Sequence, residues 1–384
     1  MKTVFAAHGN IITSLGFTAA ENFAAMEQSR SGIQKFSNSN FLPFPFFASL
    51  VDDGKLNDKC SDFRNSKNYT RLEKMFILSI SDVVEKSGLD IKNANTLLII
   101  STTKGNINLL EEENYGGFSE KRLLLSEMAN EIAHYFGMKN LPLVLSNACI
   151  SGVLAIITAQ RLISSGQYEN IIVSGGDLVS EFTLSGFNSF KALSDEPCKP
   201  YDAERKGITL GEGCGTLLLT SNEKLLNGNE KKIVVAGGSV SNDANHISGP
   251  SRTGEELALA VNNALKEANC ENEIDFISAH GTATAFNDEM ESKAFNFSGL
   301  QDVSLNSMKG FFGHTLGAAG VIESVVTLET MKQNVLLPSL GYKNLGVPMP
   351  LNIIKQRETK QINTSLKTAS GFGGCNAAVV FKAL

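Results

Sequence analysis

The sequence has no paired cysteines, no excess of positive charge and no long uninterrupted hydrophobic run. Its six cysteines are scattered, and none forms a C-x-x-C pair: Cys60, Cys149, Cys198, Cys214, Cys270 and Cys375. This spacing excludes a disulfide framework and a local zinc motif, and it favours a reducing, cytoplasmic environment. A formal net charge of -6 argues against a protein that binds nucleic acid broadly, because such binding depends on Lys and Arg.

Membrane and export signals are also missing. The most apolar stretch, Ile150–Ile163, is interrupted by Gln160 and Arg161, so it lacks the roughly 20 apolar residues that a membrane span requires. Near the N-terminus, residues 8–10 (His-Gly-Asn) end the apolar run too early for a secretory signal peptide. With 384 residues, 42% of them hydrophobic and 19% charged, the chain is long enough for two domains or one large two-part unit.

Short apolar runs alternate with helical patterns. Five runs predict strands: Thr96–Ile100, Leu141–Ser146, Asn170–Gly176, Lys232–Gly238 and Ile274–Gly281. Several are continuously apolar, which is typical of strands covered by helices on both faces. Residues Thr253–Ala268 have the period of an amphipathic helix, for which Thr253 is the expected N-cap and Glu256 the capping-box acid. These patterns predict an α/β fold.

Three sequence patterns recur in the same order in the two halves of the chain. Gly211–Thr220 resembles Gly371–Val380, and TVFAAHGNI near the N-terminus resembles KIVVAGGSV at Lys232–Val240. SNACISGVLAI and SMKGFFGHTLGAAGVIE both pass through a Gly-rich turn into an apolar helix. Chance similarity of Gly-rich turns is the alternative. We predict two similar halves, residues 1–228 and 229–384, joined near the polar segment Ser221–Lys232.

Cys149 lies between the predicted strand that ends near Ser146 and a long apolar helix. One interpretation is a small core residue, because a free cysteine is usually buried and inert. The other is a nucleophile, because the positive end of a helix dipole lowers the pKa of a thiol and favours the thiolate. The other five cysteines lack this setting and are interpreted as structural.

Two of the five histidines lie in Gly-rich turns. His280 ends an apolar strand before GTATA, and His314 lies in KGFFGHTLGAAG before a helix. Open α/β sheets place ligands at such strand ends and helix N-termini. Cys149, His280 and His314 are too far apart in sequence for local zinc spacing, so we expect no metal. A Cys-His-Asn protease would leave one of the two histidines without a role.

Five motifs, in this order, resemble those of the β-ketoacyl-acyl carrier protein synthases: SNACISG, KPYDAERKGITLGEGCGTLLL, SAHGTATAFNDEMESKA, NSMKGFFGHTLGAAGVIES and GFGGCNAAVVF. The resemblance covers most of the chain. It implies a thiolase-like α/β fold, with two pseudo-symmetric halves in αβαβα layers. It also implies an acyltransferase that carries out a decarboxylative Claisen condensation of an acyl-cysteine thioester with malonyl-acyl carrier protein. The pathway would be fatty acid synthesis or a specialised polyene or polyketide synthesis.

The resemblance implies a role for each matching residue. Cys149 would take the acyl chain as a thioester, which divides the formation of one carbon–carbon bond into two steps. His280 and His314 would stabilise the enolate that forms when the malonyl group loses carbon dioxide. Lys309 would orient and polarise the His pair, with Glu323 as its partner; a solvated surface charge is the alternative for Lys309.

The residues at the pocket entrance follow from the same resemblance. The backbone N–H groups of Cys149 and Phe372 would form an oxyanion hole, and the Phe372 ring would gate the acyl pocket. Four further residues are expected to bind substrate: Thr282, Thr284, Gly371 and Gly373. The two threonines would hydrogen-bond the pantetheine arm.

The chain also departs from the family's pattern. Ser370 stands where the family often has a second Phe, and Cys375 where it usually has Thr. The segment TKGN, residues 103–106, replaces a usual GIGG. We place Ser370 and Cys375 at the pocket entrance, so the chain-length preference stays open.

Two related proteins without this activity are the alternatives. A non-catalytic, chain-length-setting partner subunit typically lacks the nucleophile and one or both histidines. A degradative thiolase shares the fold but typically has a second Cys where a His stands here. The presence of Cys149, His280 and His314 argues against both.

The resemblance implies an acyl carrier protein as partner, no cofactor, and a homodimer or a heterodimer with a related subunit. The dimer is expected to form through the strand near Ile171–Val173. Because the carrier is acidic, we expect a basic docking surface. Its candidates are Lys67, Arg71 and Lys74 on one helical face, and Lys199, Arg205 and Lys206 in a long loop; an ordinary solvated surface is the alternative.

Overall fold

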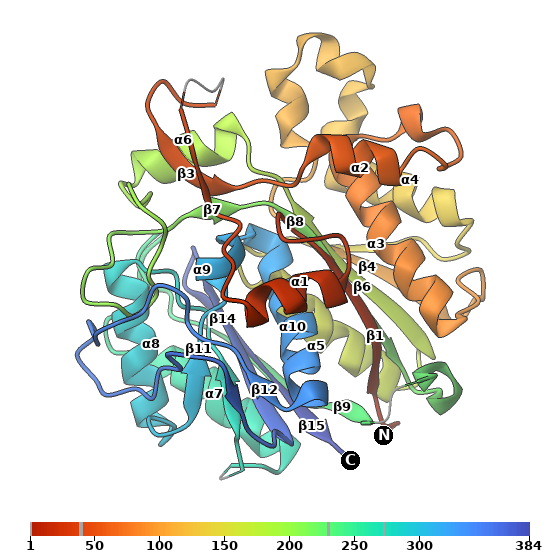
Figure 1. Ribbon diagram of the computed structural model, residues 1–384. Coiled ribbons are helices and arrows are strands. Elements are labelled where there is room, and N and C mark those ends of the chain that lie inside the picture. The colour runs from red at the N-terminus through yellow and green to blue at the C-terminus, as the bar shows by residue number, and fades with distance from the viewer. Residues whose placement is uncertain (1, 38–40, 229–230, 272) are drawn as a thin grey trace.

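A computed structural model describes residues 2–37, 41–228, 231–271 and 273–384 and contains one large mixed sheet (Figure 1). Its strands, in sheet order, are β11 (Ser304–Asn306), β10 (Phe276–Ser278), β14 (Thr364–Gly371), β15 (Cys375–Ala383), β9 (Ile233–Asn242), β1 (Phe5–Ile12), β8 (Gly213–Thr220), β6 (Asn170–Asp177), β4 (Thr96–Ser101) and β5 (Leu143–Leu145). Two small sheets contain β2 (Gln34–Phe36), β3 (Phe46–Ser49) and β7 (Leu210–Gly211), and β12 (Val335–Leu336) and β13 (Glu358–Thr359).

Ten α-helices occur in the described part of the chain: α1 (Ala19–Glu27), α2 (Asp53–Lys59), α3 (Arg71–Ser87), α4 (Leu125–Phe136), α5 (Ser151–Ser164), α6 (Glu181–Ser189), α7 (Glu255–Ala268), α8 (Ala285–Phe297), α9 (Lys309–Phe312) and α10 (Ala319–Gln333). Short 3-10 helices include η1 (Ser66–Asn68) and η6 (Leu316–Ala318). Within the described ranges, no helix combines the length and the apolar character needed to cross a membrane.

The large sheet consists of two five-stranded halves with the same strand order. From each outer edge inward, the strands occur as the third, second, fourth, fifth and first of their half: β5, β4, β6, β8, β1 and β11, β10, β14, β15, β9. The two halves meet where β1 pairs antiparallel with β9, at Phe5 and Val234. The fold is therefore the expected pseudo-symmetric one. The predicted boundary after residue 228 borders residues 229 and 230, which lie outside the described ranges, and it stays a prediction.

The helices and the two halves of the sheet form five layers. Helices α5 and α10 lie at the centre, in contact with strands of both halves, α3 and α4 cover the outer face of the first half, and α7 packs on the second half with α8 beside it (Figure 1). Helix α10 is buried along almost its whole length, and the main hydrophobic core contains side chains of α5 and α10 together with both sets of strands. This is the αβαβα arrangement, with α5 and α10 in the middle layer.

The N-terminal ends of the two central helices are packed in direct contact. A Cβ atom on Gly152 of α5 would lie 2.7 Å from the backbone nitrogen of Val321. A Cβ atom on Gly320 of α10 would lie 2.4 Å from the backbone nitrogen of Val153. Real Cβ atoms do not approach so closely, so only glycine permits this separation. The segments that lead into the two helices are thereby brought together.

Two sequence-based predictions about these elements are wrong. Helix α7 begins at Glu255, and its N-cap position is Gly254, which has a φ of 80°. The Thr253 hydroxyl pairs with the Ser251 hydroxyl at 3.1 Å and accepts only a long hydrogen bond from the Glu255 N–H, at 3.5 Å. The predicted dimer strand, Ile171–Val173, lies in β6, which is buried and paired on both sides by β4 and β8. An interior strand has no free edge for a partner chain.

Candidate active site

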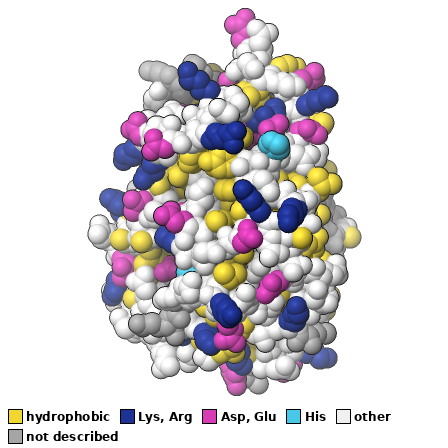
Figure 2. All heavy atoms as spheres, turned by 90° about the vertical axis from the view of Figure 1, so that its right-hand side faces the viewer, with side chains coloured by type: hydrophobic (Ala, Val, Ile, Leu, Met, Phe, Trp, Pro, Cys, Tyr) yellow, Lys and Arg dark blue, Asp and Glu magenta, His cyan; other side chains and the backbone are white. Residues whose placement is uncertain are grey.

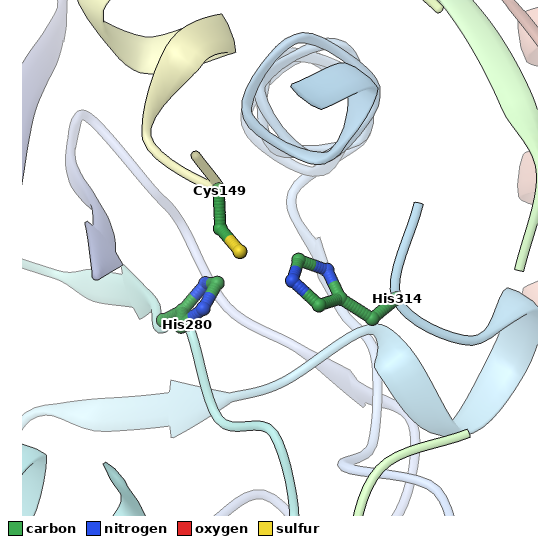
Figure 3. A group of neighbouring side chains, drawn as sticks. All are labelled: Cys149, His280 and His314. Atoms are coloured by element: carbon green, nitrogen blue, oxygen red, sulfur yellow. The ribbon is translucent and has the colours of Figure 1, made fainter. Parts of the chain in front are cut away.

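Cys149 lies in a tight turn between β5 and α5. The preceding residue, Ala148, has a φ of 44°, a left-handed conformation that a non-glycine residue adopts only when its surroundings impose it. The hydroxyl of Ser151 donates to the Ala148 carbonyl at 2.6 Å and accepts from the Asn147 N–H at 2.8 Å. The turn is therefore held by the first residue of α5, and the Cys149 side chain points away from the helix into the site (Figure 3).

His280 follows the end of β10, and its backbone is held on both sides. Its N–H donates to Glu291 of α8 at 2.8 Å, and its carbonyl accepts from the Lys309 ammonium at 2.6 Å. The same ammonium lies 3.4 Å from the ring Nδ1 of His280. Because Lys is a donor only, Nδ1 accepts, and the ring proton is on Nε2. His280 therefore offers a fixed N–H donor on the side away from Lys309.

His314 lies between α9 and η6 in a turn held by backbone hydrogen bonds. Its N–H donates to the Thr209 carbonyl at 2.8 Å, and its carbonyl accepts from Gly211 at 3.0 Å. The ring is buried, yet neither Nδ1 nor Nε2 has a hydrogen-bond partner among the residues that the structure describes. Buried polar atoms are usually paired, so this ring is available to a bound molecule.

The structure brings these three side chains together from three distant parts of the sequence. The sulfur of Cys149 and one ring nitrogen each of His280 and His314 all lie within 4.8 Å of one another. The two rings are 5.1 Å apart between centroids and nearly perpendicular, and the sulfur points between them (Figure 3). These are also residue types that bind zinc, so wide spacing in the sequence does not by itself exclude a metal, contrary to our argument from spacing.

Burial controls the ionisation of all three groups. It raises the pKa of the Cys149 thiol to about 12, with Lys309 as the main opposing influence. It lowers the pKa of both His280 and His314 well below the usual value, and Lys309 and Lys367 lower it further. The resting site therefore contains a thiol and two neutral imidazoles. Burial therefore favours the neutral thiol in the resting site, which is opposite in direction to the shift that we expected from the helix dipole.

The ionisation state of Cys149 leads to a prediction about its reactivity. Its alkylation rate with iodoacetamide is expected to rise about tenfold per unit between pH 7 and 10, because the thiolate fraction grows in that proportion below the pKa. Mass spectrometry of the labelled peptide measures the rate at this one residue. Free cysteine, whose pKa is about 8.5, is the control and should level off within the range. A plateau for Cys149 from about pH 7 would contradict the assignment.

A cluster of three buried charges lies behind His280. Lys309 contacts one carboxylate oxygen of Glu323 at 2.8 Å, and Lys367 contacts the other at 2.5 Å. All three side chains have an exposed fraction of at most 1%. Burial raises the pKa of Glu323, but the two ammonium groups outweigh it and hold that pKa below its usual value. The structure therefore places Lys309 in the interior, and the alternative of a solvated surface charge is wrong.

A cavity of about 870 Å³ leads to Cys149, His280 and His314. Four of the predicted entrance residues line it: Thr282, Thr284, Gly371 and Phe372. The two threonine hydroxyls are hydrogen-bonded to each other at 2.8 Å. Gly373 does not line the cavity and instead donates to the Ile247 carbonyl at 2.8 Å. Its predicted contact with substrate therefore has no support in the structure.

The loop around Phe372 is in contact with the nucleophile. A Cβ atom on Gly371 would lie 3.0 Å from the backbone nitrogen of Cys149. The Phe372 ring is stacked on Phe187 at 5.6 Å and meets Phe190 edge-on at 5.5 Å, which gives the cavity an aromatic wall. Ser370 also lines the cavity, whereas Cys375 is buried outside it, so the placement of Cys375 at the entrance is wrong.

The predicted docking residues do not form one surface. Lys67 lies in η1, before α3 begins at Arg71, so the common helical face is wrong. The Arg71 guanidinium is bound to Asp53 and Glu212, at 2.5 and 2.6 Å. On the side of α3 and α4, basic and acidic side chains are interspersed (Figure 2). None of Lys67, Arg71 and Lys74 lines the cavity.

Of the three docking candidates in the long loop, only Lys206 lines the cavity. The Arg205 side chain is only 8% exposed and donates to the carbonyls of Asp202 and Gly346, so it is not a docking residue. Lys199 pairs with Glu196 at 3.0 Å and does not line the cavity, whereas Lys206 does.

Sequence reasoning missed two groups of residues. Glu291 binds the N–H groups of His280 and Gly281, and Lys367 pairs with Glu323. The signal for Lys367 is visible in the sequence, as the one charged residue in the strand TSLKTASG. The other missed group consists of basic residues that line the cavity mouth: Lys191, Arg252 and Lys293.

Comparison with known proteins identifies the family. Residues 47–225 match the beta-ketoacyl synthase N-terminal domain, and residues 233–343 match the beta-ketoacyl synthase C-terminal domain. The chain is 28% identical to a 3-oxoacyl-[acyl-carrier-protein] synthase 2 of Vibrio cholerae, over 97% of each chain. It is 30% identical to nodulation protein E of Rhizobium leguminosarum bv. trifolii, over 69% of this chain and 67% of that protein.

A solved structure agrees with these relatives. The ishigamide ketosynthase/chain length factor superposes with a TM-score of 0.90 and 25% identity, over 100% of this chain and 99% of that one. The fold, the order of the motifs and the matched domains agree, and the chain belongs to the beta-ketoacyl synthase family of acyltransferases.

Proposed function

We propose that this protein is a 3-oxoacyl-[acyl-carrier-protein] synthase and that Cys149, His280 and His314 perform its condensation. The observation that carries the proposal is the convergence of one buried thiol and two neutral imidazoles, all within 4.8 Å, at the base of a large cavity. An attacking sulfur and two groups that handle protons at a carbonyl oxygen are what acyl transfer followed by decarboxylation requires.

In the first step, the sulfur of Cys149 attacks the carbonyl of an acyl thioester. Its proton passes to His314, whose ring nitrogens have no other partner in the described structure, and then to the departing carrier thiol. The N–H groups of Cys149 and Phe372 stabilise the oxyanion of the tetrahedral intermediate. The products are the acyl-Cys149 thioester and the free carrier thiol.

In the second step, a malonyl thioester binds with its carbonyl oxygen between the two imidazoles. The carboxylate leaves as carbon dioxide, and its bonding electrons form an enolate whose oxygen accepts hydrogen bonds from His280 and His314. The enolate carbon then attacks the acyl carbonyl and the bond to Cys149 breaks. The thiolate takes up one proton from solvent, which replaces the proton that left with the carrier thiol in the first step. The fixed Nε2–H of His280 supports this role, because Lys309 holds its tautomer.

We propose that no metal takes part. The three side chains have the ligand types of a zinc site, but the Lys309 ammonium lies 3.4 Å from His280, and Lys367 adds a second buried positive charge to the same cluster. Two ammonium groups so close to the ligands oppose a divalent cation.

The assay for this proposal follows the two steps separately. Mass spectrometry of the intact protein detects an acyl group on Cys149, and release of labelled carbon dioxide from a malonyl thioester measures decarboxylation. Decarboxylation without an acyl-Cys149 would favour the alternative, a chain-length-setting partner subunit of a synthase heterodimer. Primer profiling on Cys149 distinguishes fatty acid synthesis from a specialised polyene or polyketide pathway.

We propose an acyl carrier protein as the partner that delivers both substrates, and the cavity mouth as its docking surface. Lys191 and Arg252 are exposed at the mouth, beside Lys206 and Lys293. Thr282 and Thr284 line the path from this rim to Cys149, where they suit the polar groups of a pantetheine arm. All six cysteines of the chain are free thiols, which supports a cytoplasmic site of action.

Charge reversal at the mouth tests the docking surface. The K191E/R252E variant is expected to raise KM for carrier-linked substrate about tenfold at low salt with little change in kcat, because exposed charges mainly guide association. The matched control is K67E/K74E, which reverses two lysines outside the cavity. Equal effects of the two double variants, or none from K191E/R252E, would contradict the proposed surface.

We propose that a second synthase chain, either a copy of this one or a related subunit, pairs with the free edge of β5. That strand ends the sheet, and the apolar side chains of Leu141 and Leu143 are exposed there, Leu141 by 82%. An exposed apolar edge strand is an open site for pairing with another strand. The turn at Cys149 directly follows β5, so the interface would support the nucleophile.

A further inference from the structure

Lys367 has no role in the reaction described above, yet it is fully buried beside the site. It lies on β14, directly opposite Ser278 of β10 in a parallel pair. The ammonium group makes an ion pair with Glu323 at 2.5 Å. It also donates to the carbonyls of Ser278 and Ala279, at 3.2 and 3.4 Å. A buried ammonium without water is costly, so its place within the fold requires these partners.

Together, the two buried lysines hold the strand end that carries His280. Lys367 binds the carbonyls of Ser278 and Ala279, and Lys309 binds the next one, that of His280. Both ammonium groups share the single carboxylate of Glu323. The three consecutive carbonyls are thus held by two ammonium groups, and one carboxylate links these two ammonium groups to each other. A displacement of Lys367 would therefore shift His280 through the backbone at the end of β10. It would also shift Lys309 through the Glu323 carboxylate that the two lysines share.

We propose that Lys367 is a positioning residue of the condensation, which anchors the end of β10 and fixes Glu323 and Lys309 behind His280. The inference rests on the proposed function and deepens it. Lys367 touches neither substrate nor the reacting sulfur, because it does not line the cavity. Its effect is therefore expected in the step that depends on the His pair, namely malonyl decarboxylation, and much less in the loading of Cys149.

The charge of Lys367 also affects the two imidazoles electrostatically. The cluster of Lys309, Lys367 and Glu323 has two positive groups and one negative group, and the remaining charge acts on the two imidazoles. Both rings have pKa values well below the usual one, first because of burial and then because of these lysines. Other ionisable groups near the rings are Cys149 at the start of α5, Asp288 and Glu291 of α8, and Tyr201. Loss of the Lys367 charge should raise the pKa of both imidazoles.

The test compares K367M with wild type. Met keeps the length of the side chain and removes its charge and its donors. We expect kcat for malonyl decarboxylation to fall about tenfold with KM within twofold, and acyl loading of Cys149 to change less than threefold. The imidazoles act in neutral form, so raised pKa values should move the acid limb of the decarboxylation pH profile upward by about one unit. K367R, which retains the charge, should return the acid limb toward that of wild type.

The matched control is K231M. Lys231 is also partly buried in the second half, and it donates to the carbonyls of Met331 and Ile362 away from the cavity. The K231M variant should leave the rates of both half-reactions and the pH profile of decarboxylation unchanged. If K367M does not fold, K367Q gives the same comparison with a neutral donor.

An unshifted acid limb, or an equal loss in both half-reactions, would overturn the role of Lys367. Wild-type protein that neither loads an acyl group nor decarboxylates a malonyl thioester would instead overturn the proposed function.

Discussion

Substitution of Cys149 by alanine is expected to lower the condensation rate by at least about 10⁴-fold, while malonyl decarboxylation remains within about tenfold of wild type. The first effect is large because the acyl intermediate has no other sulfur to form on. The second is small because His280, His314 and the charged cluster behind them are unchanged. The fold should also persist, since alanine fits the same turn between β5 and α5.

The measurement pairs product analysis with carbon dioxide release from one protein preparation. C375A is the matched control, because Cys375 is another buried thiol, held near the Phe372 carbonyl but outside the cavity. It should retain both half-reactions. Condensation by C149A at more than a few per cent of the wild-type rate would show that another group takes the acyl chain.

The second large effect is expected at the histidines. H280A and H314A should each lower malonyl decarboxylation by roughly 10²–10³-fold, the size observed when one donor to a developing oxyanion is removed. The two variants should differ in the first step. H314A is expected to slow acyl loading of Cys149, because both ring nitrogens of His314 lack a hydrogen-bond partner in the described structure and one lies within 4.8 Å of the sulfur. H280A should affect loading less, because Lys309 occupies its Nδ1 side.

His134, exposed on α4, provides the control, and H134A should leave both steps unchanged. Equal loading rates in H280A and H314A would contradict the division of roles, although the synthase function would stand. Decarboxylation that survives in both variants would contradict the function itself.

The sequence contained enough to predict the fold and the central site. Continuous apolar strands predicted a covered sheet, and the recurrence of three patterns predicted a repeat, which the identical strand order of the two halves now explains. Cys149 was recognisable because it stands between a predicted strand and an apolar helix, and His314 because it lies in a Gly-rich turn before another apolar helix. Local patterns of this kind survive in the sequence because each is set by its own neighbours.

What the sequence did not show depends on contacts between distant segments. Desolvation of Cys149 comes from the packing of both halves around it, so its helix alone gave the wrong direction for the pKa. The pairing of Arg71 with Asp53 and Glu212, and the interior position of β6, are likewise set by tertiary structure. A basic residue or an apolar strand has the same appearance in the sequence whether it faces a partner or the core.

The contact between Gly152 and Gly320 has a consequence for stoichiometry. The pseudo-symmetric halves place Cys149 before one central helix and His314 before the other, so equivalent positions of the repeat perform different tasks at a single point. Because the two halves face each other across one axis, they share a single active site and do not form two separate ones. Each chain should therefore bind one acyl equivalent at saturation, and a dimer of two active chains should bind two.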